Sequence, residues 1–199
     1  MTTVRQIERF WNAADNGALI AHLCADRPEF APIATDRAKV IAAALAVIRI
    51  DEFGQSFHPL AARLIRSIVA GQEADGGWGD VLPTVLALRA LACSRGDGLA
   101  IENGMHWLAE LQKDDGAWPA GPPRRLPADA ATTVFVLMHL GQHARLRAAA
   151  RVGQAMKWLE ANEEQLDPAG KRLAQRALLR CRSVRQPAPP REALFSEAA

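Results

Sequence analysis

Two aspartates stand at equivalent positions of a repeated pattern and are the best-placed acids in the chain. Asp80 opens D-V-L-P-T and Asp129 opens D-A-A-T-T, so Thr84 and Thr133 each follow four residues after an aspartate. An aspartate at the start of a helix can cap the first turn, and the same carboxyl group can donate a proton to a ligand that it faces. The sequence leaves both roles open, and we assign the two threonines to the same predicted ligand site.

Arginines provide two candidate anion sites. Arg124 and Arg125 lie together in a proline-rich loop, and Arg172, Arg176 and Arg180 follow one another at a spacing of four. Guanidinium groups bind phosphates and carboxylates through paired hydrogen bonds. The second set is equally typical of a solvated face on a terminal helix, so we place only Arg124 and Arg125 among the predicted ligand-binding residues.

Neither the histidines nor the cysteines predict a metal site. His139 and His143 are four apart, a spacing that suits zinc on one helix face, but Gly141 interrupts the helix between them and no third ligand is evident. Three scattered cysteines, with no C-x-x-C, favour buried thiols over a disulfide framework: Cys24, Cys93 and Cys181. We therefore predict neither a metal nor another cofactor.

A repeated seven-residue pattern, Q-x-x-x-G-x-W, marks the elements that must position these residues. It runs from Gln72 to Trp78 and again, 40 residues later, from Gln112 to Trp118. Glutamine can bond to helix ends on both sides of a turn, glycine permits a sharp reversal, and tryptophan covers the turn with apolar surface. These are structural roles, and a period of this size predicts stacked helical repeats.

The rest of the chain predicts helices and no strands. Helical periodicity and capping signals mark residues 4–14, 18–25, 35–50, 56–70, 80–93, 99–112, 129–140, 148–162 and 168–184. Residues 81–91 and 130–140 are apolar on all sides, as a buried helix must be, whereas residues 56–70 and 99–112 have one apolar stripe. We predict an all-α fold of inner and outer helices, with residues 119–127 as an insertion in the second repeat and a fainter third repeat at Trp158-Leu159.

The repeat resembles the QW motif of squalene and oxidosqualene cyclases, class II diterpene cyclases and protein prenyltransferase β subunits. The resemblance rests on Gln72, Trp78, Gln112 and Trp118 and implies an α/α toroid around an apolar cavity that binds an isoprenoid or polycyclic molecule. The D-x-D-D acid of the class II cyclases is absent, since Asp129 stands alone. The predicted inner helices offer a single aromatic residue, Phe135, which we include among the ligand-binding residues.

Two functions follow as expectations. The first is a terpenoid-cyclase-like enzyme, an isomerase or lyase in which Asp129 or Asp80 is the single acid. The alternative is a non-catalytic binding or scaffold protein that kept the toroid and lost the D-x-D-D acid. A net charge of +2 gives no reason to expect nucleic acid binding.

The predicted domain spans residues 1–185, and residues 186–199 are predicted to be a disordered tail. The N-terminus lacks the apolar core of a signal peptide, and no stretch is apolar enough to span a membrane, so we expect a cytoplasmic protein. About nine helices form a partial toroid. We therefore expect the apolar residues 4–25 to cover the mouth of the cavity or to meet a second copy in a homodimer, unless a partner subunit completes the ring.

Overall fold

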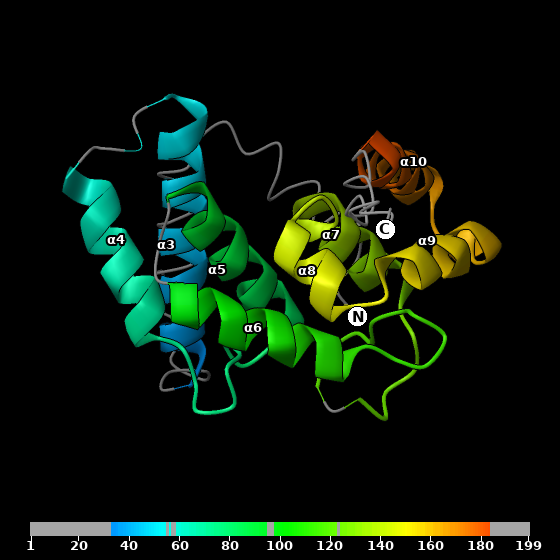
Figure 1. The fold of residues 1–199 in the computed structure, drawn as a ribbon, viewed down its shortest axis with the longest axis horizontal. Coiled ribbons are helices and arrows are strands. Elements are labelled where there is room, and N and C mark those ends of the chain that lie inside the picture. Colours follow the sequence, from blue (N-terminus) through cyan, green and yellow to red (C-terminus); the bar gives the residue numbers. More distant parts are fainter. Residues whose placement is uncertain (1–32, 55, 57–58, 95–97, 123, 184–199) are drawn as a thin grey trace, which may run out of the picture.

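Helices make up most of the chain in a computed structural model that describes residues 33–54, 56, 59–94, 98–122 and 124–183. The helices are α3 (Ile33–Glu52), α4 (Pro59–Ala70), α5 (Val81–Cys93), α6 (Gly98–Leu111), α7 (Ala130–Leu140), α8 (Ala144–Ala149), α9 (Val152–Ala161), the 3₁₀ helix η2 (Glu163–Gln165) and α10 (Pro168–Ser183) (Figure 1). The described residues contain no strand, only one isolated bridge between Pro119 and Ala128. The predicted all-α class is confirmed.

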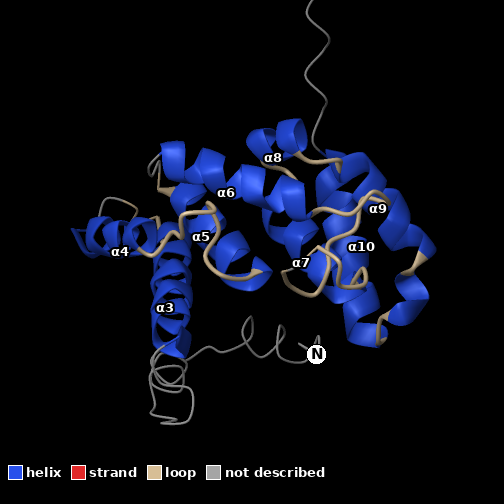
Figure 2. Cartoon of the chain, turned by 90° about the horizontal axis from the view of Figure 1, so that it is seen from below, coloured by secondary structure: helices blue, strands red, loops and turns tan. Residues whose placement is uncertain are grey.

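Four helices form a row through the middle of the molecule. α3 packs against α5, α5 against α7, and α7 against α10. The remaining helices lie along the outside of this row: α4 on α3, α6 on α5, α9 on α7, and α8 beside α6 (Figure 2). We call the first set the inner row and the second set the outer helices. Inner and outer helices alternate from α3 to α7, as the hydrophobic pattern predicts, but α8 and α9, which follow one another, are both outer helices.

Burial follows the apolar pattern of each helix. In α5 every residue from Val81 to Leu91 is buried except Leu82 and Arg89, because apolar side chains surround the helix and neighbours cover it on most sides. Outer helix α6 buries one stripe and exposes polar side chains on the other: Glu102, Asn103, His106 and Glu110. Among the described helices none combines the length and the hydropathy that a membrane-spanning segment requires.

Most predicted boundaries hold to within three residues, but the helix predicted over residues 148–162 is wrong. The chain forms α8 and α9 there, with a break at Ala150 and Arg151. The backbone N–H of Arg151 donates to the Gln112 side-chain oxygen at 2.8 Å, so a contact from the preceding repeat sets the start of α9. The helices predicted over residues 4–14 and 18–25, and the tail at 186–199, lie outside the described residues.

Candidate functional site

The first repeat turn is tied to the next outer helix through one glutamine. The Nε2 atom of Gln72 donates to the carbonyl oxygen of Gly76, within its own turn, at 2.8 Å. It also donates to the carbonyl oxygen of Ala100, in the first turn of α6, at 2.9 Å. One side chain therefore closes the turn and fixes it to α6.

Gln112 repeats this arrangement in the second turn. Its Nε2 donates to the carbonyl oxygen of Gly116 at 2.6 Å, and its Oε1 accepts the bond from Arg151 at the start of α9. The side chain is 2% exposed, so both of its polar atoms are satisfied by the protein in a site that excludes water. The two glutamines thus have the structural role that the repeat predicts.

The two motif tryptophans fix each turn to the outer helix that precedes it. Trp78 donates its ring N–H to the carbonyl oxygen of Ile68, in α4, at 2.7 Å, and Trp118 donates to Leu108, in α6, at 2.8 Å. In both cases the acceptor lies ten residues earlier, near the carboxyl end of the helix, where carbonyl groups lack helical partners. Both rings are fully buried.

Thr84 and Thr133 belong to the same structural unit, which corrects their predicted role as ligand-binding residues. Both side chains are completely buried. Their hydroxyl oxygens accept hydrogen bonds from the backbone N–H groups of Trp78 at 2.9 Å and Trp118 at 3.1 Å. The D-x-x-x-T pattern therefore attaches each turn to the inner helix that follows it, and neither hydroxyl is available to a ligand.

Asp80 and Asp129 both begin inner helices. The Oδ1 atom of Asp80 accepts a hydrogen bond from the backbone N–H of Val81 at 2.6 Å, at the start of α5. The Oδ1 atom of Asp129 accepts one from Thr132 at 2.6 Å, at the start of α7. Each carboxylate thus satisfies an N–H group that has no partner within the helix.

Asp80 differs from Asp129 in its surroundings. Asp80 is half-buried and follows Gly79, which has a φ of +79°. The guanidinium of Arg37 packs against Gly79, because a Cβ atom there would lie only 2.6 Å from the Cζ atom of Arg37. On its other side Asp80 is covered by Gly121 of the insertion loop, residues 119–127. Burial raises the pKa of Asp80, while the Val81 N–H and Arg37 act in the opposite direction.

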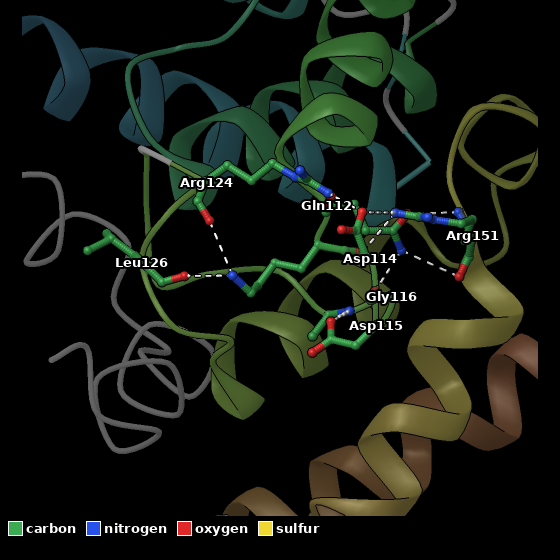
Figure 3. A network of polar contacts seen from close by, with 9 residues as sticks. Gln112, Asp114, Asp115, Gly116, Arg124, Leu126 and Arg151 are labelled. Carbon is green, nitrogen blue, oxygen red and sulfur yellow. Dashed lines mark hydrogen bonds and ion pairs between the residues drawn. The ribbon is translucent and has the colours of Figure 1, made fainter.

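The insertion loop is held against the second turn by a polar network (Figure 3). Lys113 donates from Nζ to the carbonyl oxygens of Arg124 at 3.3 Å and Leu126 at 3.1 Å. Arg124 donates from Nε to the carbonyl oxygen of Gln112 at 2.8 Å and from Nη2 to Asp114 at 2.6 Å. The loop that covers Asp80 is therefore anchored at several points.

Arg151 completes the network from the side of α9. Its Nη2 atom donates to the carbonyl oxygen of Lys113 at 2.8 Å and lies 3.9 Å from the carboxylate of Asp114. The hydrogen bond from Arg124, followed by its charge and that of Arg151, lowers the pKa of Asp114. Two guanidinium groups thus cap the carbonyl groups that follow α6 and share one carboxylate.

Arg124 and Arg125, both predicted from the sequence to bind an anion, have different surroundings in the structure. Both line a surface depression of about 570 Å³, together with Lys113, Asp114 and Asp115. The guanidinium of Arg124 is engaged with Gln112 and Asp114. Arg125 is exposed and makes none of the contacts of the network. We therefore assign Arg124 to holding the loop, and only Arg125 retains a free guanidinium within this depression.

We predict that Arg124→Gln loosens the insertion loop. The substitution removes the ion pair to Asp114 and the hydrogen bond to Gln112, so amide hydrogen exchange over residues 119–128 should accelerate by about tenfold, in line with the loss of about 1–2 kcal/mol of local stability. Exchange monitored by mass spectrometry measures this. Arg125→Gln is the matched control and should leave the exchange rate unchanged; equal acceleration in both variants would contradict the role given to Arg124.

Phe135 and the two histidines lie at the carboxyl-terminal half of α7 and just beyond it. Phe135 is buried, and its ring centroid lies 4.5 Å from that of His139, so it packs in the core and presents little surface to a ligand. Burial first, then the charges of Arg89 and Arg180, lower the pKa of His139. Burial, Arg145 and Arg89 lower that of His143. Both imidazoles are therefore neutral at neutral pH, and the described part of the chain contains no group of residues able to hold a metal ion.

The inner row keeps one accessible stripe on each of its two central helices. On α5 this stripe consists of Leu82 and Arg89; α7 has half-buried residues at Ala131 and Met138, and beside them at Thr132 and His139. Leu82 corresponds to Ala131, and Arg89 to Met138, when the two repeats are aligned on Asp80 and Asp129. Equivalent positions of successive repeats are thus the accessible ones on two helices that pack against each other, and we call these residues together the inner face.

Sequence reasoning missed this surface. Arg89 attracts no attention in the sequence because it is a single charge within the apolar helix α5, and Arg37 attracts none because it stands between other charged residues, Asp36 and Lys39. Arg89 lies nine residues after Asp80 and six before Arg95, a spacing that gives no pattern, and only the burial of its neighbours in α5 identifies it. Comparison of the chain with protein-family models, with curated proteins and with solved structures finds no match.

Proposed function

We propose that the chain binds an apolar small molecule, of the isoprenoid or polycyclic class, on the inner face and that Asp80 acts on it as an acid. The observation that carries this proposal is the position of Asp80. It lies two residues before Leu82, where the accessible stripe of α5 begins, and burial raises its pKa. Burial that raises the pKa of a carboxyl group beside an apolar surface makes the group better suited to donate a proton than a fully solvated one.

The chemistry would be an isomerisation that consumes no other reactant. The O–H bond of Asp80 breaks as its proton forms a C–H bond with an alkene carbon of the ligand, which leaves a carbocation. The carboxylate then takes a proton from a neighbouring carbon, so the electron pair of that C–H bond forms a double bond at a new position and Asp80 is protonated again. Arg37, beside Asp80, stabilises the carboxylate between the two steps.

A second candidate is a non-catalytic binding or scaffold protein, the alternative that the sequence leaves open. It is favoured by the capping contacts, because the Oδ1 atoms of both Asp80 and Asp129 accept helix N–H groups. In this case the repeat turns and the insertion loop serve only to hold the inner face in shape. The two candidates predict different behaviour for one substitution.

We predict that Asp80→Asn preserves the fold and removes any turnover. Asparagine caps a helix about as well as aspartate, so the cost in stability should be within about 0.5 kcal/mol at acidic pH. The raised pKa means that the folded state binds the proton more tightly than the unfolded state. The contribution of the Asp80 carboxyl to the free energy of unfolding therefore falls as the pH rises through its titration range. The variant should lack this loss and be at least as stable as the natural protein at pH 7 by urea unfolding.

Turnover is measured by incubating the protein with squalene or farnesol and analysing the products by gas chromatography. Asp129→Asn is the matched control, because it changes the equivalent cap in the next repeat. Loss of products in Asp80→Asn alone supports the acid; equal activity of all three proteins contradicts it. If the natural protein binds these molecules and forms no product, the non-catalytic candidate is the correct one.

A further inference from the structure

The two ends of the inner face differ in chemistry. At the end where the helices begin, the accessible residues are the apolar Leu82 and Ala131. Seven residues later, near the end where the helices finish, α5 presents Arg89 and α7 presents Met138. Seven residues of helix separate these levels by about 10 Å. An elongated molecule lying along the stripe would thus meet apolar side chains at one end and a guanidinium at the other.

A second guanidinium reaches the same level from α10. The Nη1 atom of Arg180 lies 3.7 Å from the sulfur of Met138, and α10 packs directly against α7. Arg89 and Arg180 both lie close enough to His139, the residue after Met138, to act on it electrostatically. Three neighbouring helices of the inner row therefore bring two cations to one place around Met138 and His139.

Carboxylates do not neutralise this pair. Two acidic residues at the end of α3 act on Cys93, as Arg89 does, and both have other partners: Asp51 accepts a hydrogen bond from Ser56 at 2.7 Å, and Glu52 forms an ion pair with Arg49 at 2.6 Å. Among the residues that the structure describes, neither Arg89 nor Arg180 has a carboxylate within ion-pair distance. His139 is neutral and adds no charge of its own. The two guanidinium groups keep their capacity to bind an anion.

We propose that the ligand of the inner face carries an anionic head group, which Arg89 and Arg180 bind, and that its apolar chain extends from there toward Leu82 and Ala131. This inference rests on the proposed function and deepens it, because it fixes the direction of the ligand. With the head at the carboxyl-terminal ends of the helices, the far end of the chain lies at the level of Asp80. The shared chemistry is an anion on an apolar chain, whether the anion is a carboxylate or a phosphate.

The competing explanation is that the two arginines only stabilise the helices that carry them. Arg180 lies in the last turn of α10, where positive charge interacts favourably with the helix dipole, and Arg89 lies four residues before the end of α5. On that explanation their removal lowers the thermal midpoint and leaves ligand affinity unchanged. Affinity and stability must therefore be measured on the same variants.

The experiment uses three probes with the same chain: laurate, dodecyl phosphate and 1-dodecanol. Each is titrated against the 199-residue chain carrying the neutral fluorescent reporter N-phenyl-1-naphthylamine, and displacement gives the dissociation constant. We expect one or both anions to bind more tightly than dodecanol, and the stronger of the two identifies the head group. Arg89→Gln and Arg180→Gln should each weaken that anion about tenfold and change dodecanol by less than twofold.

Arg66→Gln is the matched control, because Arg66 is exposed on outer helix α4 and its removal changes the net charge equally. It should leave all three affinities unchanged. If dodecanol binds and the anions bind no better, or if the two substitutions weaken dodecanol as much as the anion, the anionic head is excluded while the apolar site stands. If none of the probes displaces the reporter or the reporter itself fails to bind, the proposed function fails and this inference fails with it.

Discussion

Replacing Trp118 by alanine should destabilise the protein by about 3–5 kcal/mol, the range seen when a fully buried tryptophan is truncated. The ring is 0% exposed and belongs to the main hydrophobic core. Its removal opens a cavity beside α6 and leaves the carbonyl oxygen of Leu108 without its hydrogen-bond partner. Urea unfolding followed by circular dichroism measures the free-energy change.

Two further substitutions separate the contributions at this position. Trp118→Phe keeps most of the apolar ring and loses the N–H donor, so it should cost about 1–3 kcal/mol, the penalty for a buried carbonyl group without a partner. Trp158→Ala removes a tryptophan ring of the third repeat that stands at the position of Trp107, inside an outer helix, and that is only half-buried, so it should cost less than Trp118→Ala. Equal costs for Trp118→Ala and Trp158→Ala would mean that the ring of the second turn has no special role.

The sequence predicted the repeat turns well because every contact in them comes from a residue at a fixed position of the pattern. Gln72 and Gln112 bond to the same two places in successive repeats, and the tryptophans bond ten residues back in both. The buried character of α5 and α7 was also predictable, since it follows from hydrophobic periodicity. Such features are determined by residues that lie close together in the sequence, and they recur in each repeat.

Other features depend on partners that are distant in sequence, and the sequence alone could not predict them. The break before α9 has no glycine or proline to mark it and arises where Gln112 binds the backbone of Arg151. Arg124 resembles its neighbour Arg125 in the sequence, yet only Arg124 reaches Gln112 and Asp114. The third repeat was also hard to predict from the sequence, because it lacks the Q-x-x-x-G-x-W pattern.

That third repeat nevertheless begins its inner helix in the same way as the second. Asp167 accepts a hydrogen bond from the backbone N–H of Gly170 at 2.7 Å, three residues later, just as Asp129 accepts one from Thr132. The helix that follows, α10, buries Ala174, Ala177, Leu178 and Cys181 on one face and exposes arginines on the other. α10 thus ends the inner row with a polar outer surface, as terminal repeats require.

Replacing Gly116 by alanine should destabilise the protein by about 2–5 kcal/mol, for two reasons that add. The residue has a φ of +94°, a conformation that costs an alanine about 1–2 kcal/mol. A Cβ atom would also lie 2.7 Å from the backbone nitrogen of Ala155 and 2.7 Å from the carbonyl carbon of Gln154, both in α9. Backbone atoms inside a helix cannot move aside as a flexible side chain can, so the turn and α9 must separate, at an overpacking cost of about 1–3 kcal/mol.

Gly54→Ala is the matched control for the cost that a positive φ imposes on alanine. Gly54 has a φ of +69°, and a Cβ atom there would have no neighbour within 4 Å, so the variant measures the conformational cost alone. Gly76→Ala tests the equivalent position of the first repeat, where a Cβ atom would lie 2.9 Å from the Asn103 carbonyl oxygen in α6. Thermal and urea unfolding should rank Gly54→Ala as the mildest variant, and a Gly116→Ala variant no less stable than Gly54→Ala would show that the second turn does not press against α9.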